Sequence, residues 1–164
     1  MYKLGDQVVY GVHGVCRIVD IEQRRIDRKT IEYYVLAPVH SETSCFYIPT
    51  QNEKALSKLL PLLTEDELSR MLLWAKREDL WIEEDNTRKQ KVKEVLASGD
   101  RKEIIGWVRT MHIHRQRLLD EGKKFHQADE LFLKDAEKLL TTEFAIVLGI
   151  TETAVRQYVE QMVM

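Results

Sequence analysis

The sequence predicts an α+β protein in which a small N-terminal β-barrel precedes an all-α C-terminal bundle of about five helices. Short runs of alternating β-branched and aromatic residues dominate the chain up to about residue 50, as strands require. After residue 60, apolar residues recur at helical spacing between residues that typically begin and end helices. We therefore expect two domains, 1–55 and 64–164, joined by a linker over 56–63.

The N-terminal half contains four runs with strand character. Asp27 and Arg28 stand between the second and third of these runs and are predicted to form the tip of a β-hairpin. Four or five short strands within about 50 residues are too few for a sandwich, but they can close a barrel of the SH3-like or Tudor-like kind. The four runs cover 7–10, 15–25, 30–39 and 45–48.

Capping residues predict where the helices of the C-terminal half begin and end. Thr64 and Glu67 form a capping box, and Asp100 with Glu103 repeats this pattern before a later helix. Gly99 follows an apolar stripe and is typical of a left-handed C-cap. The five predicted helices begin near residues 64, 86, 100, 127 and 151.

Charge is distributed unevenly along the 164 residues. The chain carries 25 Lys and Arg against 27 Asp and Glu, and this net charge of -2 argues against a strongly basic nucleic-acid binder. Residues 86–124, however, hold eleven basic and five acidic side chains, while 51–85 and 125–164 are each net acidic. Near-neutrality therefore hides one strongly basic block.

Several classes of protein are not predicted. No apolar run approaches the roughly 20 residues that span a bilayer, and the start lacks the apolar core of a signal peptide, so we expect a cytoplasmic protein. The sequence has no glycine-rich phosphate loop, nucleophile elbow or Cys-x-x-Cys pair, so neither an enzyme nor a metal or cofactor site is predicted. Cys16 and Cys45 are expected to be small buried side chains rather than a disulfide. His112 and His114 point to different sides of one helix and are expected at solvent or at an interface.

The basic block is the main candidate for nucleic-acid binding. Cations at the start of a helix oppose its dipole, so helix stability alone does not require those near residue 88. They would suit a phosphate backbone, although a merely solvated face is the alternative. The predicted DNA-contacting residues are Arg88, Lys89, Lys91, Lys93, Arg101, Lys123 and Lys124.

A second nucleic-acid signal lies near the C-terminus. Residues 145–156 resemble a helix-turn-helix, with an alanine before the turn and a glycine within it. The second helix offers only Arg156 against Glu152 and Glu160, whereas a major-groove reader normally carries several cationic or amide side chains. A bundle-capping helix is favoured, and a stand-alone repressor that uses 141–163 is kept as an alternative.

Both halves of the chain share motifs with a known family. The N-terminal motifs are Lys3–Tyr10, Glu32–Leu36 and Ile48–Pro49, and the C-terminal motifs are Leu96–Asp100 and Leu148–Ile150. Together they resemble the CarD/CdnL family of bacterial transcription regulators. The first half resembles the RNA-polymerase-interacting domain of that family, which transcription-repair coupling factor also contains.

The resemblance implies a mechanism and a set of contacts. The Tudor-like domain would dock on the RNA polymerase β subunit through exposed strands, which include Val35 and Pro49. Arg24 falls at the family's basic polymerase contact, and Tyr47 falls where some members carry a second arginine. The helical domain would touch promoter DNA weakly at the upstream edge of the melting bubble and stabilise the open complex. We expect a monomer.

One position departs from the family. Some members carry a tryptophan wedge for the minor groove just before the basic residues of the second helix. Asp85 or Asn86 stands there in this sequence, and neither side chain can act as a wedge. Trp81, four residues earlier, either replaces the wedge as a DNA contact or packs between the domains, and packing is favoured. A protein-interaction adaptor without DNA contact is therefore a third alternative.

Overall fold

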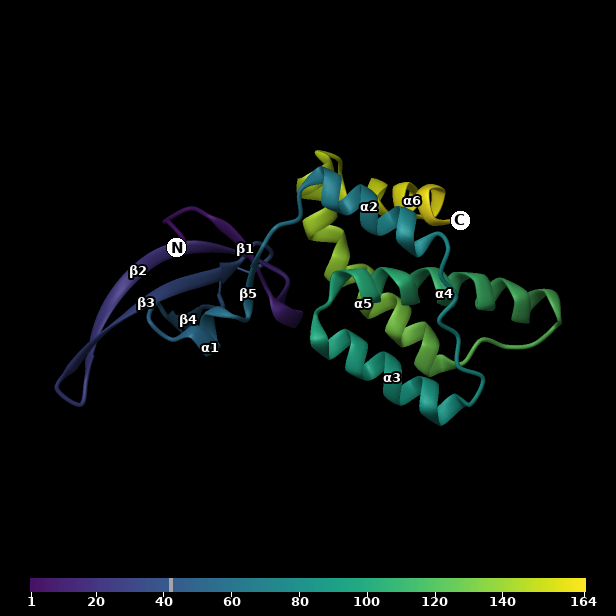
Figure 1. Ribbon diagram of the computed structural model, residues 1–164, viewed down its shortest axis with the longest axis horizontal. Helices are drawn as coiled ribbons and strands as arrows, with labels where there is room; N and C mark the ends of the chain where they lie inside the picture. Colours follow the sequence, from purple (N-terminus) through teal and green to yellow (C-terminus); the bar gives the residue numbers. More distant parts are fainter. Residues whose placement is uncertain (42) are drawn as a thin grey trace. The chain divides into compact units, whose positions relative to one another are not determined.

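The computed structural model describes residues 1–41 and 43–164, and it divides the chain into two compact units, Met1–Leu62 and Leu63–Met164 (Figure 1). The first unit is built on a five-stranded antiparallel sheet, and the second contains five helices. The predicted α+β fold class is therefore confirmed. Within the described residues, no helix has both the length and the apolar character needed to cross a membrane.

The N-terminal unit is a meander with one later strand added at its edge. The strands follow the spatial order β4-β3-β2-β1-β5, so that β4 and β5 form the two edges and each ends at a proline. A 3₁₀ turn, η1 (Gly11–His13), and a short helix, α1 (Glu53–Leu56), complete the unit. The strands are β1 (Gln7–Tyr10), β2 (Val15–Ile26), β3 (Lys29–Pro38), β4 (Phe46–Pro49) and β5 (Leu59–Pro61).

One face of this sheet forms the core of the unit. Leu59 of β5 belongs to that core and is 4 % exposed, and Leu60 lies opposite Val9 of β1. The predicted linker over 56–63 is therefore wrong, because its middle residues, 59–61, form strand β5 of the sheet. A strand of three residues that ends in proline gives no periodic signal in a sequence. The buried core residues are Val8, Cys16, Ile18, Tyr34, Leu36, Ile48 and Leu59.

β2 and β3 form a hairpin that extends beyond the rest of the unit (Figure 1). The two strands pair as far as Ile26 and Lys29, whereas β4 pairs with β3 only between Tyr33 and Leu36. The predicted tip is confirmed. Asp27 and Arg28 both have positive φ, at 50° and 66°, as a two-residue type I′ turn requires.

The helices of the C-terminal unit begin and end near the predicted positions. The hydroxyl of Thr64 accepts a hydrogen bond from the Glu67 amide at 3.1 Å, and Asp100 caps the amides of Lys102 and Glu103. Gly99 adopts a left-handed conformation with φ 68°. The helices are α2 (Glu65–Ala75), α3 (Asp85–Ser98), α4 (Arg101–Asp120), α5 (Gln127–Leu148) and α6 (Glu152–Val163).

The core of the helical unit centres on α4. Trp107 and Met111 are almost completely buried there, together with residues from all the other helices of the unit. At Gly106 the helix approaches its surroundings closely, because a Cβ at this position would lie 3.0 Å from both Leu80 and Trp74. The segment between α2 and α3 is therefore packed tightly onto α4.

The two cysteines lie in different environments. Cys16 is fully buried in the sheet core, as predicted, whereas Cys45 is exposed. Both thiols are free. The expectation of a buried side chain at Cys45 is therefore wrong, because the residue lies just before edge strand β4 rather than within the core.

Candidate interaction surfaces

The four predicted polymerase contacts lie on one face of the N-terminal sheet. Residues directly opposite each other in an antiparallel pair project from the same face. The strand register therefore aligns Arg24, Val35, Tyr47 and Pro49 on the face opposite the core, which we call the outer face. On this face, the residues that lie opposite one another across β2, β3 and β4 are Asp20 with Val35 and Tyr47, and Glu22 with Tyr33 and Pro49. Nearer the tip, where only β2 and β3 pair, Arg24 lies opposite Ile31.

Arg24 and Tyr47 form a cation–aromatic cluster on the outer face. The guanidinium carbon of Arg24 lies 4.1 Å from the centroid of the Tyr47 ring, and Tyr33 meets the same ring edge-on at 6.4 Å. Glu22 accepts a hydrogen bond from Arg24 Nε at 3.2 Å, and this bond raises the pKa of the arginine. The Arg24 side chain is 46 % exposed, and Tyr47 is 42 % exposed. The cluster is therefore held in position and open to a partner.

Val35 does not belong to the accessible part of this surface. It is only 4 % exposed, because its neighbours in register, Asp20 and Tyr47, flank it on the same face. The prediction of Val35 as a direct contact is corrected to a buried position beside Tyr47. Pro49 is half-buried at the end of edge strand β4.

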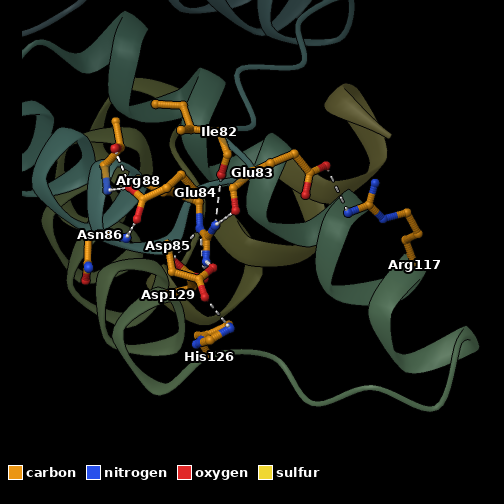
Figure 2. A network of polar contacts seen from close by, with 10 residues as sticks. Ile82, Glu83, Glu84, Asp85, Asn86, Arg88, Arg117, His126 and Asp129 are labelled. Carbon is orange, nitrogen blue, oxygen red and sulfur yellow. Dashed lines mark hydrogen bonds and ion pairs between the residues drawn. The ribbon is translucent and has the colours of Figure 1, made fainter.

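Arg88 lies inside the helical unit rather than on its surface. Its side chain is 2 % exposed, and its Nε donates to both carboxylate oxygens of Asp129 at 3.1 Å. One terminal nitrogen donates to Asp85 at 2.9 Å, and the other donates to the carbonyl of Ile82 at 2.8 Å. Figure 2 shows these groups converging on the guanidinium, with His126 reaching Asp85 from the other side.

This network removes Arg88 from the predicted DNA contacts. Burial alone would lower the pKa of Arg88, but the hydrogen bonds to Asp129 and Asp85 outweigh it and raise the pKa. A guanidinium with these partners cannot also reach a phosphate. Arg88 instead joins the first turn of α3 to Asp129 in the first turn of α5 and to the segment before α3.

Trp81 also packs within the helical unit. Its ring stacks on His114 at 4.3 Å with an angle of 6°, and the Arg88 guanidinium lies over it at 4.2 Å. Its Nε1 is buried and has no hydrogen-bond partner in the described residues. Packing is therefore observed, within the unit rather than between domains, and the assignment of Trp81 as a DNA contact is corrected.

The two histidines of α4 are both held by carboxylates. His114 is 5 % exposed, and its Nε2 lies 2.8 Å from Asp79, so its expected place at solvent or at an interface is wrong. Partial burial acts to raise the pKa of Asp79, but the hydrogen bonds with His114 and the Trp81 amide, together with the nearby positive charges, outweigh it, and the pKa is lowered. His112 is half-buried and lies 2.9 Å from Glu137.

Arg101 is a second predicted DNA contact with a structural role. Its side chain is 13 % exposed and forms an ion pair with the buried Glu143, which also accepts a hydrogen bond from the Leu63 amide at 2.9 Å. Burial raises the pKa of Glu143, although the Leu63 amide and Arg101 act to lower it. Arg101 therefore balances the negative charge of a buried carboxylate.

The accessible cations lie elsewhere on α3 and in the loop after α4. Lys89 and Lys93, four positions apart, are exposed on one side of α3 and have no ion-pair partner among the described residues. Lys91 is half-exposed and pairs with Glu103 at 3.2 Å, and Lys123 pairs with Glu121 at 3.2 Å. Lys124 is exposed.

An open groove between α3 and α5 adds a residue that the sequence did not indicate. Lys134 of α5 lines this groove opposite Lys89, beside the exposed Leu131. Lys134 lies in a net acidic part of the sequence, so the charge count concealed it. We refer to Lys89, Lys93 and Lys134 as the lysine surface. The groove is lined by Lys89, Gln127, Ala128, Glu130, Leu131 and Lys134.

The candidate helix-turn-helix has the expected helices but few free cations. Gly149, with φ 65°, ends α5, and α6 begins three residues later. Arg156 on α6, the basic residue of the candidate recognition helix, forms an exposed ion pair with Glu160 at 3.2 Å. The arrangement supports the bundle-capping role that the sequence favoured.

Comparison with known proteins agrees with the N-terminal geometry. Residues 2–60 match the family described as the CarD-like/TRCF RID domain. Nearly the whole chain is similar to the protein named "Putative transcription factor YdeB" from Bacillus subtilis (strain 168), with 24 % identity over 168 residues that cover 96 % of this chain and 99 % of that protein. The resemblance inferred from the motifs is confirmed for the N-terminal unit, whose residues 2–60 match the CarD-like/TRCF RID domain.

Proposed function

We propose that this chain is a non-enzymatic transcription regulator that binds the RNA polymerase β subunit through the outer face of its N-terminal sheet. The observation that supports this most directly is the Arg24–Tyr47 cluster, which is exposed on the family domain and contains the predicted contact residue. Exposed arginine and aromatic side chains that are already ordered are typical of the residues that dominate binding at protein interfaces. Tyr47 would contribute buried area in place of a second charge.

The helical unit would add weak, sequence-independent contacts to promoter DNA. The lysine surface presents cations of Lys89 and Lys93 on α3 and of Lys134 on α5. Such contacts are individually weak and sensitive to salt. They become effective when polymerase binding holds the unit near the promoter at an effective concentration of roughly millimolar. We propose that these contacts stabilise the open promoter complex.

Co-purification of the full chain with RNA polymerase tests the first contact. We expect Arg24→Glu to weaken the complex because it reverses the exposed charge, and Tyr47→Ala to weaken it because it removes the ring on which Arg24 lies. Lys54→Glu, at an exposed position of α1, is the matched control and should bind like the wild type. Wild-type binding by both outer-face variants would overturn the proposal.

The lifetime of the open complex tests the DNA contact. We expect Lys89→Glu with Lys93→Glu to shorten this lifetime while polymerase binding is retained, because reversed charges repel the phosphate backbone. Lys76→Glu with Arg77→Glu, two exposed positions at the end of α2, provides an equal charge change elsewhere in the helical unit. Equal lifetimes for the two double variants would instead support an adaptor without DNA contact.

Binding to free DNA separates the proposal from a stand-alone repressor. Weak and non-selective binding is expected in the absence of polymerase. Tight binding to one sequence, abolished by Arg156→Ala, would favour the helix-turn-helix alternative. The ion pair between Arg156 and Glu160 argues against that outcome.

A further inference from the structure

The two-stranded end of the β2–β3 hairpin carries an excess of positive charge. Arg25, Arg28 and Lys29 are exposed and have no ion-pair partner among the described residues, and Asp27 is the acidic side chain between them. Arg24 differs, because Glu22 and Tyr47 engage it at the base of this segment. We refer to residues 25–29 as the ribbon tip. It lies outside the Arg24–Tyr47 cluster and outside the lysine surface.

The cations of the ribbon tip are distributed around it rather than on one side. Arg25 is opposite Thr30, and Lys29 is opposite Ile26, in adjacent pairs of the ladder. Because adjacent pairs project from opposite faces, Arg25 and Lys29 lie on different faces of the ribbon. Arg28 occupies the turn itself. Positive charge therefore surrounds the end of the hairpin.

The shape of the hairpin is equally specific. β4 pairs with β3 no farther toward the tip than Tyr33, so beyond that point β2 and β3 form a ribbon of only two strands. Figure 1 shows this ribbon extending away from the other strands of the unit. A two-stranded ribbon fits within the major groove of duplex DNA, which is about 12 Å wide.

From this combination we infer that the ribbon tip is an arm that enters a groove of duplex DNA and contacts phosphates on both of its sides. A groove presents phosphates to both faces of an inserted ribbon, whereas an acidic protein surface would meet only one face. The positions of Arg25, Arg28 and Lys29 match the first arrangement. The N-terminal unit would then contribute its own DNA contact, independent of the lysine surface.

The salt dependence of binding to a labelled duplex of mixed sequence tests this inference in the full chain. The ribbon variant is Arg25→Gln, Arg28→Gly and Lys29→Gln, in which glycine suits the positive φ of the turn. Its control, Lys3→Gln, Lys54→Gln and Lys58→Gln, removes the same charge from exposed positions of the same unit. The slope of log affinity against log salt should fall by about 0.9 for each phosphate that the variant no longer neutralises.

In the ribbon variant we expect the magnitude of this slope to decrease by about 2.7 in total if all three cations contact phosphates. In the control we expect little change. Equal changes in both variants would show a general charge effect and overturn the inference. An unchanged slope in the ribbon variant would also overturn it. Weaker polymerase binding with an unchanged DNA slope would assign the tip to an acidic protein surface instead.

A second variant tests the opposite sign. Asp27→Asn removes the acidic side chain of the tip, and asparagine is well suited to the positive φ at this position. We expect tighter binding to the duplex, and weaker or equal binding would contradict the inference. Lys89→Glu with Lys93→Glu in the same assay reports on the lysine surface, so that failure of that proposal is distinguished from failure of this one.

Discussion

The guanidinium of Arg88 and the carboxylate of Asp129 form a buried ion pair between residues 41 positions apart, with each side chain 2 % exposed. The pair joins the first turn of α3 to the first turn of α5. Lys89 follows Arg88 directly on α3, and Lys134 lies on α5. The buried pair therefore sets the separation of the two sides of the lysine surface.

Breaking this pair from one side should destabilise the helical unit strongly. We expect Asp129→Leu to lower the free energy of unfolding by about 3–5 kcal/mol, because it removes the buried carboxylate and leaves the buried Arg88 guanidinium with only the exposed carboxylate of Asp85. Urea unfolding followed by tryptophan fluorescence measures this effect, since Trp74, Trp81 and Trp107 all lie in the helical unit.

The matched control for this prediction is Lys89→Met, at an exposed position next to Arg88, which should change stability by no more than about 0.5 kcal/mol. The double variant Arg88→Met with Asp129→Leu should lose less free energy of unfolding than the sum of the losses in the two single variants, because neither charge of the pair is then left buried without its partner. Additive losses would contradict the coupling of the two side chains.

Glu143 should make stability fall as the pH rises. Burial raises its folded-state pKa above the ordinary value of 4.5, so ionisation costs more in the folded chain than in the unfolded chain. The stability that protonated Glu143 contributes is fully present below pH 4.5 and is lost as the pH rises through its raised folded-state pKa. Unfolding measured from about pH 4 to pH 7 should show Glu143→Gln gaining stability relative to the wild type. Glu94→Gln, exposed on α3, is the control, and an equal trend in both variants would refute the assignment.

Gly106→Ala should destabilise the helical unit even though alanine favours helices. The added methyl group would lie 3.0 Å from atoms of both Leu80 and Trp74, and the rigid indole ring cannot easily yield. Overpacking of this kind costs about 1–3 kcal/mol, which offsets a helix-propensity gain of about 1 kcal/mol. Thermal unfolding followed by tryptophan fluorescence tests this expectation. A higher melting temperature than the wild type would show that Leu80 and Trp74 can adjust.

The two thiols should react at very different rates. Burial raises the pKa of Cys16 to about 11, whereas Cys45 is exposed. A disulfide reagent at about pH 8 should therefore modify one thiol quickly, because the thiolate is the reactive form. Cys45→Ser should abolish the fast phase, and Cys16 should then react only as the N-terminal unit unfolds. Two fast thiols in the wild type would contradict the buried position of Cys16.

Local signals in the sequence predicted much of the fold. Helix limits followed from residues that satisfy free backbone groups in their own neighbourhood, such as Thr64, Gly99 and Asp100. β5 was missed because it is held by pairing with a distant strand rather than by its own pattern. Cys45 was misplaced for a similar reason, since the position of a residue at a sheet edge depends on the whole topology.

The candidate surfaces were predicted less completely than the fold. The alternation of side chains along strands was sufficient to place Arg24 and Tyr47 on one face, but not to show that Val35 is covered between its neighbours. Arg88 appeared to be a surface cation because its partner, Asp129, is distant in sequence. Lys134 shows the converse, since a cation in an acidic stretch can still border a basic groove.

The short edges of the N-terminal sheet limit how this protein can associate with itself. β4 has four residues and β5 has three, and each ends at a proline, Pro49 or Pro61, that has no amide hydrogen to donate. A strand from a second molecule could form only a few backbone hydrogen bonds at either edge before the ladder was interrupted. Propagation of the sheet from copy to copy through β4 or β5 is therefore limited to a few hydrogen bonds, even where many molecules are concentrated together.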